Sequence, residues 1–184
     1  MKIAILSDIH DNVWDLAVCL EGLQEAEALI CCGDLCSPFI VSLLAEGFRD
    51  RPIHIVFGNN DGDLYRITNN GKRFDYVRLH GEFFETELDG QRFAVNHYDN
   101  IARRIAASGE YQVVCYGHNH IYKIEPLGRT LTINPGAIMG YDPINKADIP
   151  STFVIYDTYT GAVTGYQVQS RAKRVVAYHS TAVR

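Results

Sequence analysis

Short apolar runs separated by polar loops dominate the first half of the chain. Four of these runs have the length and the aliphatic content of buried strands: residues 2–6, 28–32, 52–57 and 112–116. Between the first two runs, apolar residues recur at three- and four-residue steps, as on one face of a helix: Val13, Leu16, Ala17, Leu20 and Leu23. A second helix is predicted from Pro38, whose ring suits a first turn, to Ala45. Alternating strands and helices indicate an α/β protein.

The second half is richer in predicted strands. Residues 83–88 and 92–96 flank Asp89-Gly90, a strong hairpin signal because both turn residues tolerate positive φ. A short helix is expected at 101–107, and further strands are expected at 122–126, 131–134, 152–156 and 162–168. Because we find no repeat, low-complexity stretch or linker, we expect a single domain over residues 1–184.

The last fifteen residues allow three interpretations. The segment 170–174 is polar and basic, and Val175 to Tyr178 is apolar. Residues 170–184 could therefore contain a last strand, form an oligomer contact, or be a loosely ordered tail. The sequence alone leaves these possibilities open, and with them the oligomeric state.

Composition narrows the classes of function. The chain has 184 residues, of which 47% are hydrophobic, so it can build a substantial core. Its net charge of −5 supplies no basic face for a nucleic-acid backbone, so large DNA or RNA is not an expected partner. No apolar run approaches the roughly 20 residues of a membrane span. The N-terminus begins directly on a predicted strand without a secretory pattern, and a cytoplasmic location is expected.

The five cysteines do not form a disulfide pattern. They lie at positions 19, 31, 32, 36 and 115, an odd number without framework spacing. Those in apolar runs are expected to pack as small hydrophobic side chains, as free cysteines of the cytosol do. A thiolate metal site at Cys31, Cys32 and Cys36 is the alternative, but these residues lack C-x-x-C spacing.

Polar clusters with metal-ligand chemistry follow the strand-like runs. They are Asp8-Ile9-His10, Gly33-Asp34, Gly58-Asn59-Asn60-Asp61 and Gly117-His118-Asn119-His120, with His97 between the last two. Since α/β proteins place functional loops outside the carboxyl ends of their strands, these distant residues can meet at one rim. Carboxylates, amides and imidazoles together suit divalent metals, and metal-assisted hydrolysis is the first hypothesis.

The order of these clusters resembles the calcineurin-like metallophosphoesterase superfamily. Its signature runs DxH, GD, GNH[DE], a lone His and GHxH, and the chain is most similar to the small prokaryotic YfcE-like phosphodiesterase branch. The short length and the Asn134-Pro135-Gly136 turn point to that branch. The resemblance implies a four-layer α/β/β/α sandwich of two mixed sheets, with the metals at the sheet edge.

The resemblance also implies a ligand set for two metals. Asp8, His10 and His120 would hold one metal, Asn59, His97 and His118 the other, and Asp34 would bridge them. Oxygen and imidazole ligands suit Mn, Fe, Zn or Ni, with Mn favoured, and the absence of thiolate argues against a structural zinc site.

A two-metal phosphodiesterase mechanism follows from this resemblance. The two cations, roughly 3.5–4 Å apart, would share a hydroxide and direct it at the phosphorus of a small phosphate ester. The catalytic residues would be Asp34, Asn59, Asn60 and His97. We find no G-x-S-x-G elbow or Walker glycine loop that would favour a serine hydrolase or a P-loop enzyme.

Asn60 departs from the family pattern, in which many members have histidine. That histidine is held to stabilise charge or to protonate the leaving group, and an amide cannot act as a general acid near neutral pH. We therefore expect a preference for diesters and good leaving groups over monoesters. Asp61 is expected to support the loop from behind the ligands.

Other residues near the motifs have weaker assignments. The sequence Asn96-His97-Tyr98-Asp99 stands where the branch commonly has a His-Gly type of sequence, so Tyr98 and Asp99 add bulk and charge near the site. Tyr141 and Asp142 line the rim or are solvated. The side chains of Asp11 and Asn12 are predicted to cap the following helix. Asn12 is a further candidate for supporting the metal site. The remaining histidines are interpreted as structural or solvated: His54, His80 and His179.

Two alternatives remain beside the phosphodiesterase. One is a non-catalytic, metal-binding scaffold that binds protein partners, as the retromer subunit with the same fold does. The other is a phosphomonoesterase or a cyclic-nucleotide phosphodiesterase. The intact ligand set favours an enzyme acting on a small phosphorylated substrate.

Overall fold

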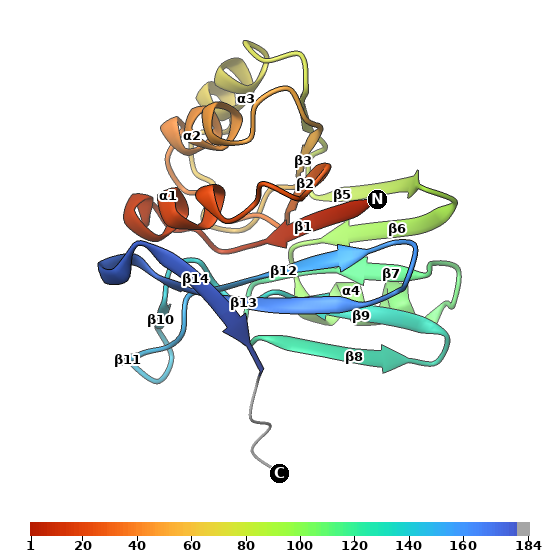
Figure 1. Ribbon diagram of the computed structural model, residues 1–184. Coiled ribbons are helices and arrows are strands. Elements are labelled where there is room, and N and C mark those ends of the chain that lie inside the picture. Colours follow the sequence, from red (N-terminus) through yellow and green to blue (C-terminus); the bar gives the residue numbers. More distant parts are fainter. Residues whose placement is uncertain (180–184) are drawn as a thin grey trace.

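A computed structural model describes residues 1–179, in which two mixed β-sheets pack face to face (Figure 1). The larger sheet has seven strands in the order β14-β13-β12-β1-β2-β3-β4. Their bounds are β1 (Lys2–Leu6), β2 (Ala28–Cys31), β3 (Ile53–Ile55), β4 (Val77–Leu79), β12 (Thr152–Asp157), β13 (Val163–Gln169) and β14 (Arg174–Tyr178). Strands β1 to β4 are parallel, and β12 runs antiparallel to β1.

The smaller sheet has five strands in the order β5-β6-β7-β9-β8. Their bounds are β5 (Phe83–Leu88), β6 (Gln91–Asn96), β7 (Val113–Cys115), β8 (Lys123–Leu127) and β9 (Thr130–Asn134). Strands β6, β7 and β9 are parallel, and β5 and β8 close the two edges in the antiparallel direction. A separate hairpin joins β10 (Tyr141–Asp142) to β11 (Ala147–Asp148).

Helices form the outer layers. On the larger sheet, α1 (Val13–Glu21) and α2 (Phe39–Gly47) share an apolar cluster with β1, β2 and β3, and α3 (Leu64–Gly71) packs beside α2 and β4. On the smaller sheet, α4 (Asp99–Ala107) packs on β6, β7 and β9. The predicted four-layer α/β/β/α sandwich is therefore confirmed.

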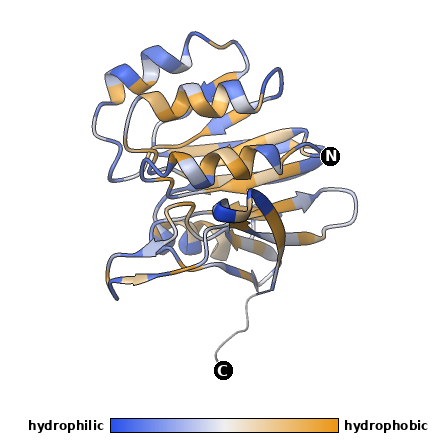
Figure 2. Ribbon diagram, turned by 60° about the vertical axis from the view of Figure 1, so that its left-hand side comes forward, coloured by the Kyte–Doolittle hydropathy of each residue, from blue (hydrophilic) through white to orange (hydrophobic). Residues whose placement is uncertain are grey.

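The central strand β1 shows why its sequence is continuously apolar. Ile3 and Ile5 point into the core between the two sheets, whereas Ala4 and Leu6 point into the core under the helices. Successive side chains of a strand face opposite sides, so a strand covered on both faces needs apolar residues at every position. The central strands are accordingly mainly orange in Figure 2.

The strand directions gather several loops at one edge of the sandwich. The carboxyl ends of the parallel strands β1, β2 and β3 lie at one edge of the larger sheet, and those of β6 and β7 do so in the smaller sheet. The loops that leave these ends carry the polar clusters of the sequence. Stacking of the two sheets brings the two sets of loops together.

Some elements differ from the prediction. Helix α3 was not expected because its sequence is mostly polar, with only Ile67 and Gly71 buried. It begins at the cap Asp63, whose side chain accepts a hydrogen bond from the backbone N–H of Arg66 at 3.0 Å. Asn70 then ties the helix to the carbonyl of Pro38 at 2.8 Å. The small β10–β11 hairpin was also missed.

The segment from residue 170 to residue 178 has regular secondary structure. Residues Ser170–Ala172 form a 3-10 turn, and β14 pairs with β13 in an antiparallel register. Of the three interpretations, the last strand is therefore the one that the structure contains. Residues 180–184 of the expected tail lie outside the described residues. Among the helices described, none is long and apolar enough to cross a membrane.

A pair of histidines connects β3 and β4 to the smaller sheet. The Nδ1 atom of His54 lies 3.0 Å from Nε2 of His80, and both rings stack on Phe84 of β5. Burial, followed by the neighbouring His80 and Arg78, lowers the pKa of His54 to about 4. Burial also lowers the pKa of His80. Both therefore serve the packing as neutral rings.

This pair makes the fold sensitive to acid. The unfolded chain protonates His54 below about pH 6.5, but the folded chain resists protonation down to about pH 4. Stability is therefore lost as the pH falls through this window, by about 2 kcal/mol after allowance for partial exposure. Urea unfolding of chelator-treated protein from pH 7 to 4 should show this loss, and His54→Gln should reduce it. An equal pH dependence in His54→Gln and in the exposed-site control His179→Gln would contradict the assignment.

Candidate metal centre

The loops at the carboxyl ends of the strands are joined by backbone hydrogen bonds. The N–H of Asp8, after β1, donates to the carbonyl of Gly33, after β2, at 3.0 Å. The N–H of Gly117, after β7, donates to the carbonyl of His97, after β6, also at 3.0 Å. The N–H of His118 then reaches across the sheets to both carboxylate oxygens of Asp8, at 3.2 and 3.1 Å. These bonds fix the predicted ligands relative to one another.

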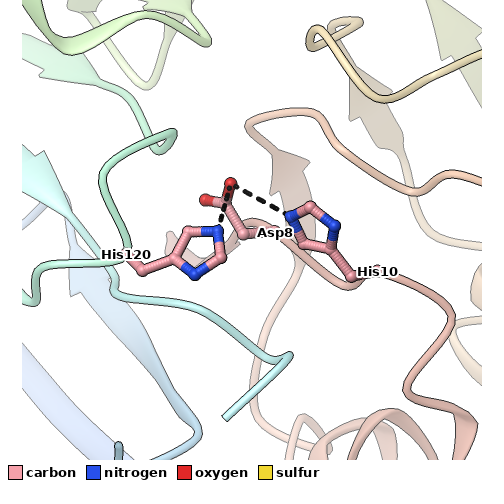
Figure 3. Close-up of side chains that lie close together, drawn as sticks. All are labelled: Asp8, His10 and His120. Carbon is pink, nitrogen blue, oxygen red and sulfur yellow. Dashed lines mark ion pairs between the residues drawn. The ribbon is translucent and has the colours of Figure 1, made fainter. Parts of the chain in front are cut away.

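A first cluster consists of Asp8, His10 and His120 (Figure 3). The Nε2 atoms of the two histidines face the same oxygen, Oδ1 of Asp8, at 3.8 Å for His10 and 3.5 Å for His120. Asp8 is fully buried. The three side chains come from two loops that are more than a hundred residues apart in sequence, and they converge as the motif order indicated.

A second cluster consists of Asn59, His97 and His118. The amide oxygen Oδ1 of Asn59 lies 3.1 Å from Nε2 of His97 and 2.9 Å from Nδ1 of His118. The two imidazole nitrogens are themselves 3.3 Å apart. One oxygen and two nitrogen atoms thus lie within 3.3 Å of one another.

Asp34 lies between the two clusters. Its Oδ2 atom is 3.4 Å from Nε2 of His10 on one side and 3.4 Å from Nε2 of His97 on the other. Asp8, Asp34 and His97 also form a compact ligand group of their own. A single carboxylate oxygen therefore faces both histidine clusters, which is the position that a bridging ligand requires.

Hydrogen bonds on the far side of the rings orient the histidines. Nδ1 of His97 donates to the carbonyl of Cys32, and Nδ1 of His120 donates to the carbonyl of Tyr141, both at 2.8 Å. Each bond fixes the tautomer whose Nε2 lone pair faces the site. Nε2 of His10 is buried and has no hydrogen-bond partner in the described chain. A buried ring nitrogen without a partner is costly unless a ligand occupies it.

The electrostatics favour ionised carboxylates. Burial raises the pKa of Asp8, but His10 and His120 beside it outweigh burial and hold the pKa well below its usual range. For Asp34, His97 and Asn60 likewise outweigh burial and lower the pKa. Burial lowers the pKa of His97, but Asp34 and Asp8 raise it more. The two carboxylates thus present negative charge that protons or metal cations can neutralise.

Backbone strain is concentrated in these loops. Within residues 1–179, eleven non-glycine residues have positive φ, and seven of them lie in the site loops. Five of those seven are predicted ligands: Asp8, His10, Asp34, His118 and His120. Such conformations each cost about 1–3 kcal/mol and persist only where the surroundings enforce them. The strain therefore marks this edge as functional.

Two glycines give the site room. A Cβ atom at Gly58 would lie 2.2 Å from Oδ1 of Asp34, and one at Gly117 would lie 2.0 Å from the Ser7 hydroxyl and 2.4 Å from Oδ2 of Asp8. Neither glycine has positive φ, so close approach and not turn geometry explains both.

Asp61 supports the site from behind. Its Oδ2 atom accepts hydrogen bonds from the backbone N–H of Gly58 at 2.8 Å and of Asp34 at 3.0 Å, and Oδ1 accepts from Cys36 at 2.9 Å. One carboxylate therefore joins the loops that follow β2 and β3. Burial raises the pKa of Asp61.

Asn12 caps α1 as expected, but Asp11 does not. Oδ1 of Asn12 accepts from the N–H of Asp15 at 3.2 Å, and its Nδ2 donates to the carbonyls of Ile138 and Met139. The hydrogen bonds of this side chain therefore go to backbone groups and not to the predicted ligand side chains. The prediction that the Asp11 side chain caps α1 is wrong, because its carboxylate accepts from the N–H and the hydroxyl of Ser37.

The four residues at the rim contact their neighbours in different ways. The ring of Tyr98 meets those of His97 and His118 edge-on, and the carboxylate of Asp99 accepts from Asn119 at 3.3 Å. Tyr141 reaches His120 through its carbonyl, and Asp142 holds the turn of the β10–β11 hairpin.

Sequence reasoning missed two supporting side chains. Asn134 donates to the carbonyl of Gly117 and to Oδ1 of Asn119, which fixes the loop of His118 and His120. Its place directly before Pro135-Gly136 was the signal. The buried hydroxyl of Ser7 lies beside Asp8, and no pattern in the sequence distinguished it.

The cysteines take no part in a thiolate site. Cys31 packs under the helices and Cys32 packs between the two sheets, so their side chains lie on opposite faces of the larger sheet. Sγ of Cys36 lies 3.5 Å from Nδ1 of His10, on the side of the ring away from Asp8 and Asp34. Three oxygen donors and four imidazoles remain, a set that fits divalent metals.

Comparisons with known proteins agree with this chemistry. The family model of the calcineurin-like phosphoesterase superfamily domain matches residues 1–161. The chain is 31% identical to phosphodiesterase MJ0936 of Methanocaldococcus jannaschii over 147 residues, which is 77% of this chain and 86% of that protein. It is also similar to the structure of a novel archaeal phosphodiesterase, with a TM-score of 0.81 and 29% identity, covering 91% of this chain and 100% of that one.

More distant structures share the fold alone. Vacuolar protein sorting 29 from Cryptosporidium parvum superimposes with a TM-score of 0.71 at 15% identity, covering 97% of this chain and 96% of that one. The phosphoesterase YfcE from E. coli superimposes with a TM-score of 0.65 at 19% identity, covering 96% of this chain and 97% of that one. Together with the match over residues 1–161 and the converging ligand loops, these findings establish that the chain belongs to the calcineurin-like phosphoesterase superfamily.

Proposed function

We propose that this protein is a metal-dependent phosphodiesterase that hydrolyses a small phosphate ester at a centre of two divalent metals. The observation that carries the proposal is the position of Oδ2 of Asp34, 3.4 Å from Nε2 of both His10 and His97. An ionised carboxylate oxygen between two groups of oriented donors is suited to bridge two cations.

The donors divide between the two metal positions. Asp8, His10 and His120 would hold one metal, and Asn59, His97 and His118 the other, with Asp34 between them. When bound, two such cations supply an activated water nucleophile and neutralise charge on the phosphate. Mn²⁺ is the favoured metal, with Ni²⁺, Fe²⁺ and Zn²⁺ as alternatives, because all accept mixed oxygen and imidazole ligands.

The chain's own residues set the reaction conditions. Carbonyl partners orient His97 and His120, so ligand geometry costs no reorganisation during turnover. Asn60 supplies amide hydrogens but no transferable proton, so the leaving oxygen must depart without a general acid at this position. We therefore favour diesters with good leaving groups, and place the reaction in the cytoplasm.

A scaffold function is the second candidate, since vacuolar protein sorting 29 shares the fold. The buried Nε2 of His10, which lacks a hydrogen-bond partner in the described chain, favours metal binding but does not separate the two functions. Complete retention of the donors and their orienting carbonyls favours catalysis, because a surface that only binds proteins does not need them. Phosphodiesterase MJ0936, 31% identical, supports the same choice.

Metal-restored hydrolysis tests the function. Chelator-treated protein should be inactive toward bis(p-nitrophenyl) phosphate, and Mn²⁺ should restore turnover by at least about a hundredfold, because the cations supply the nucleophile and charge neutralisation. Turnover of p-nitrophenyl phosphate measured in parallel should be slower. Absence of diester turnover with Mn²⁺, Ni²⁺ or Zn²⁺ would reject the enzyme and favour the scaffold.

Asp34→Ala tests the bridging ligand. Removal of the shared carboxylate should abolish binding of at least one metal, since both positions lose a negatively charged ligand. Metal content after dialysis against Mn²⁺, measured by elemental analysis, reports the stoichiometry. Asp63→Ala, which alters an acidic residue at the cap of α3, is the control and should keep the wild-type stoichiometry. Two metals retained in Asp34→Ala would refute the assignment.

Asn60→His tests the substrate preference. An imidazole at this position can protonate a leaving oxygen, so the ratio of monoesterase to diesterase activity should rise about tenfold or more. The two p-nitrophenyl substrates and an alkyl phosphate with a poor leaving group provide the measurement. If the ratio remains unchanged, the missing general acid does not set the preference.

A further inference from the structure

The amide of Asn60 holds the carboxylate that would bridge the metals. Its backbone N–H donates to Oδ1 of Asp34, and its side-chain Nδ2 donates to Oδ2, each at 2.8 Å. Within residues 1–179 the side chain of Asn60 makes no other hydrogen bond. The residue is exposed, so its side chain fills no space in the core.

The two hydrogen bonds have different compatibility with metal binding. Oδ2 is the atom that faces His10 and His97 at equal distances, and a carboxylate oxygen has two lone pairs. If Oδ2 contacts two cations, neither lone pair remains for Nδ2 of Asn60. Oδ1 points to the backbone N–H of Asn60 and retains that bond. Metal loading and the side-chain bond therefore compete, while the backbone bond persists.

We propose that Asn60 is a positioning residue whose side-chain amide holds Asp34 until the metals bind and is then released to donate to a phosphoryl oxygen of the substrate. This inference rests on the proposed function. Asn60 would thereby couple metal binding to substrate binding.

The coupling predicts opposite effects on the two ligands. Asn60→Ala removes the bond that competes with the metals, so Mn²⁺ should bind more tightly. A hydrogen bond to a charged group is strong enough for about a tenfold change in affinity. The same variant removes a donor to the substrate, so KM for bis(p-nitrophenyl) phosphate should rise several-fold, with a smaller change in kcat.

The experiment combines a calorimetric titration of chelator-treated protein with Mn²⁺ alone and thermal unfolding of the same protein with and without Mn²⁺. Wild type, Asn60→Ala and the control Asn70→Ala are compared. Asn70 is matched because its Nδ2 also makes a 2.8 Å hydrogen bond, but to the carbonyl of Pro38. Asn60→Ala should lower the melting temperature without metal and enlarge the rise on adding Mn²⁺, because binding to the folded state stabilises it in proportion to affinity. Asn70→Ala should also lower the melting temperature without metal, but the rise on adding Mn²⁺ should equal that of wild type.

The outcomes separate this inference from the function. Unchanged or weaker Mn²⁺ binding in Asn60→Ala, in a protein that hydrolyses the diester, would overturn the role of Asn60 and leave the phosphodiesterase intact. Tighter Mn²⁺ binding with an unchanged KM would overturn the release toward substrate. Mn²⁺ binding without any hydrolysis in the wild type would reject the proposed function, while the competition at Asp34 would still be measured by the titration.

Discussion

The central constraint is the burial of negative charge at the meeting point of the two sheets. Asp8 is fully buried and Asp34 nearly so, and their pKa values lie below the ordinary range. Buried carboxylates are costly unless charges and hydrogen bonds compensate. The surrounding histidines and backbone N–H groups provide this compensation only if the loops after β1, β2, β6 and β7 stay together. The sandwich is thus the framework that keeps these charges in place.

This constraint explains why strain and glycine gather at one edge. Left-handed backbone at Asp8, His10 and Asp34 turns their side chains into the site, and Gly58 and Gly117 leave the space that the carboxylates occupy. The strain is tolerated because the strands beneath are apolar on both faces and packed on both sides. The stability of the core therefore offsets the strain at the rim, where metal binding would need precise donor geometry.

The sequence predicted the strands and the convergence of the loops that carry the proposed ligands, because both leave strong local patterns. Apolar runs at residues 2–6 and 28–32 are followed, after one intervening residue, by Asp8 and Asp34, and parallel strands bring such ends together. It did not predict α3, whose capping by Asp63 and bond from Asn70 replace a hydrophobic face. The hydrogen-bond partners of individual side chains could not be predicted from the sequence either. Asp11 meets Ser37 from another loop, a contact that only the folded chain creates.

The same limit applies to the groups that orient the proposed metal ligands. The partners of His97 and His120 are backbone carbonyls, of Cys32 and Tyr141, and every residue has a carbonyl. No residue type therefore marks this contribution, although it decides which ring nitrogen faces the site. The order of residue types along the chain indicates which class of reaction to expect. The histidine tautomers, and the lone pairs that they leave free, depend instead on where the backbone of distant loops passes. In this fold that path is set by the packing of the strands together with polar side chains that join the loops, such as Asp61 and Asn134.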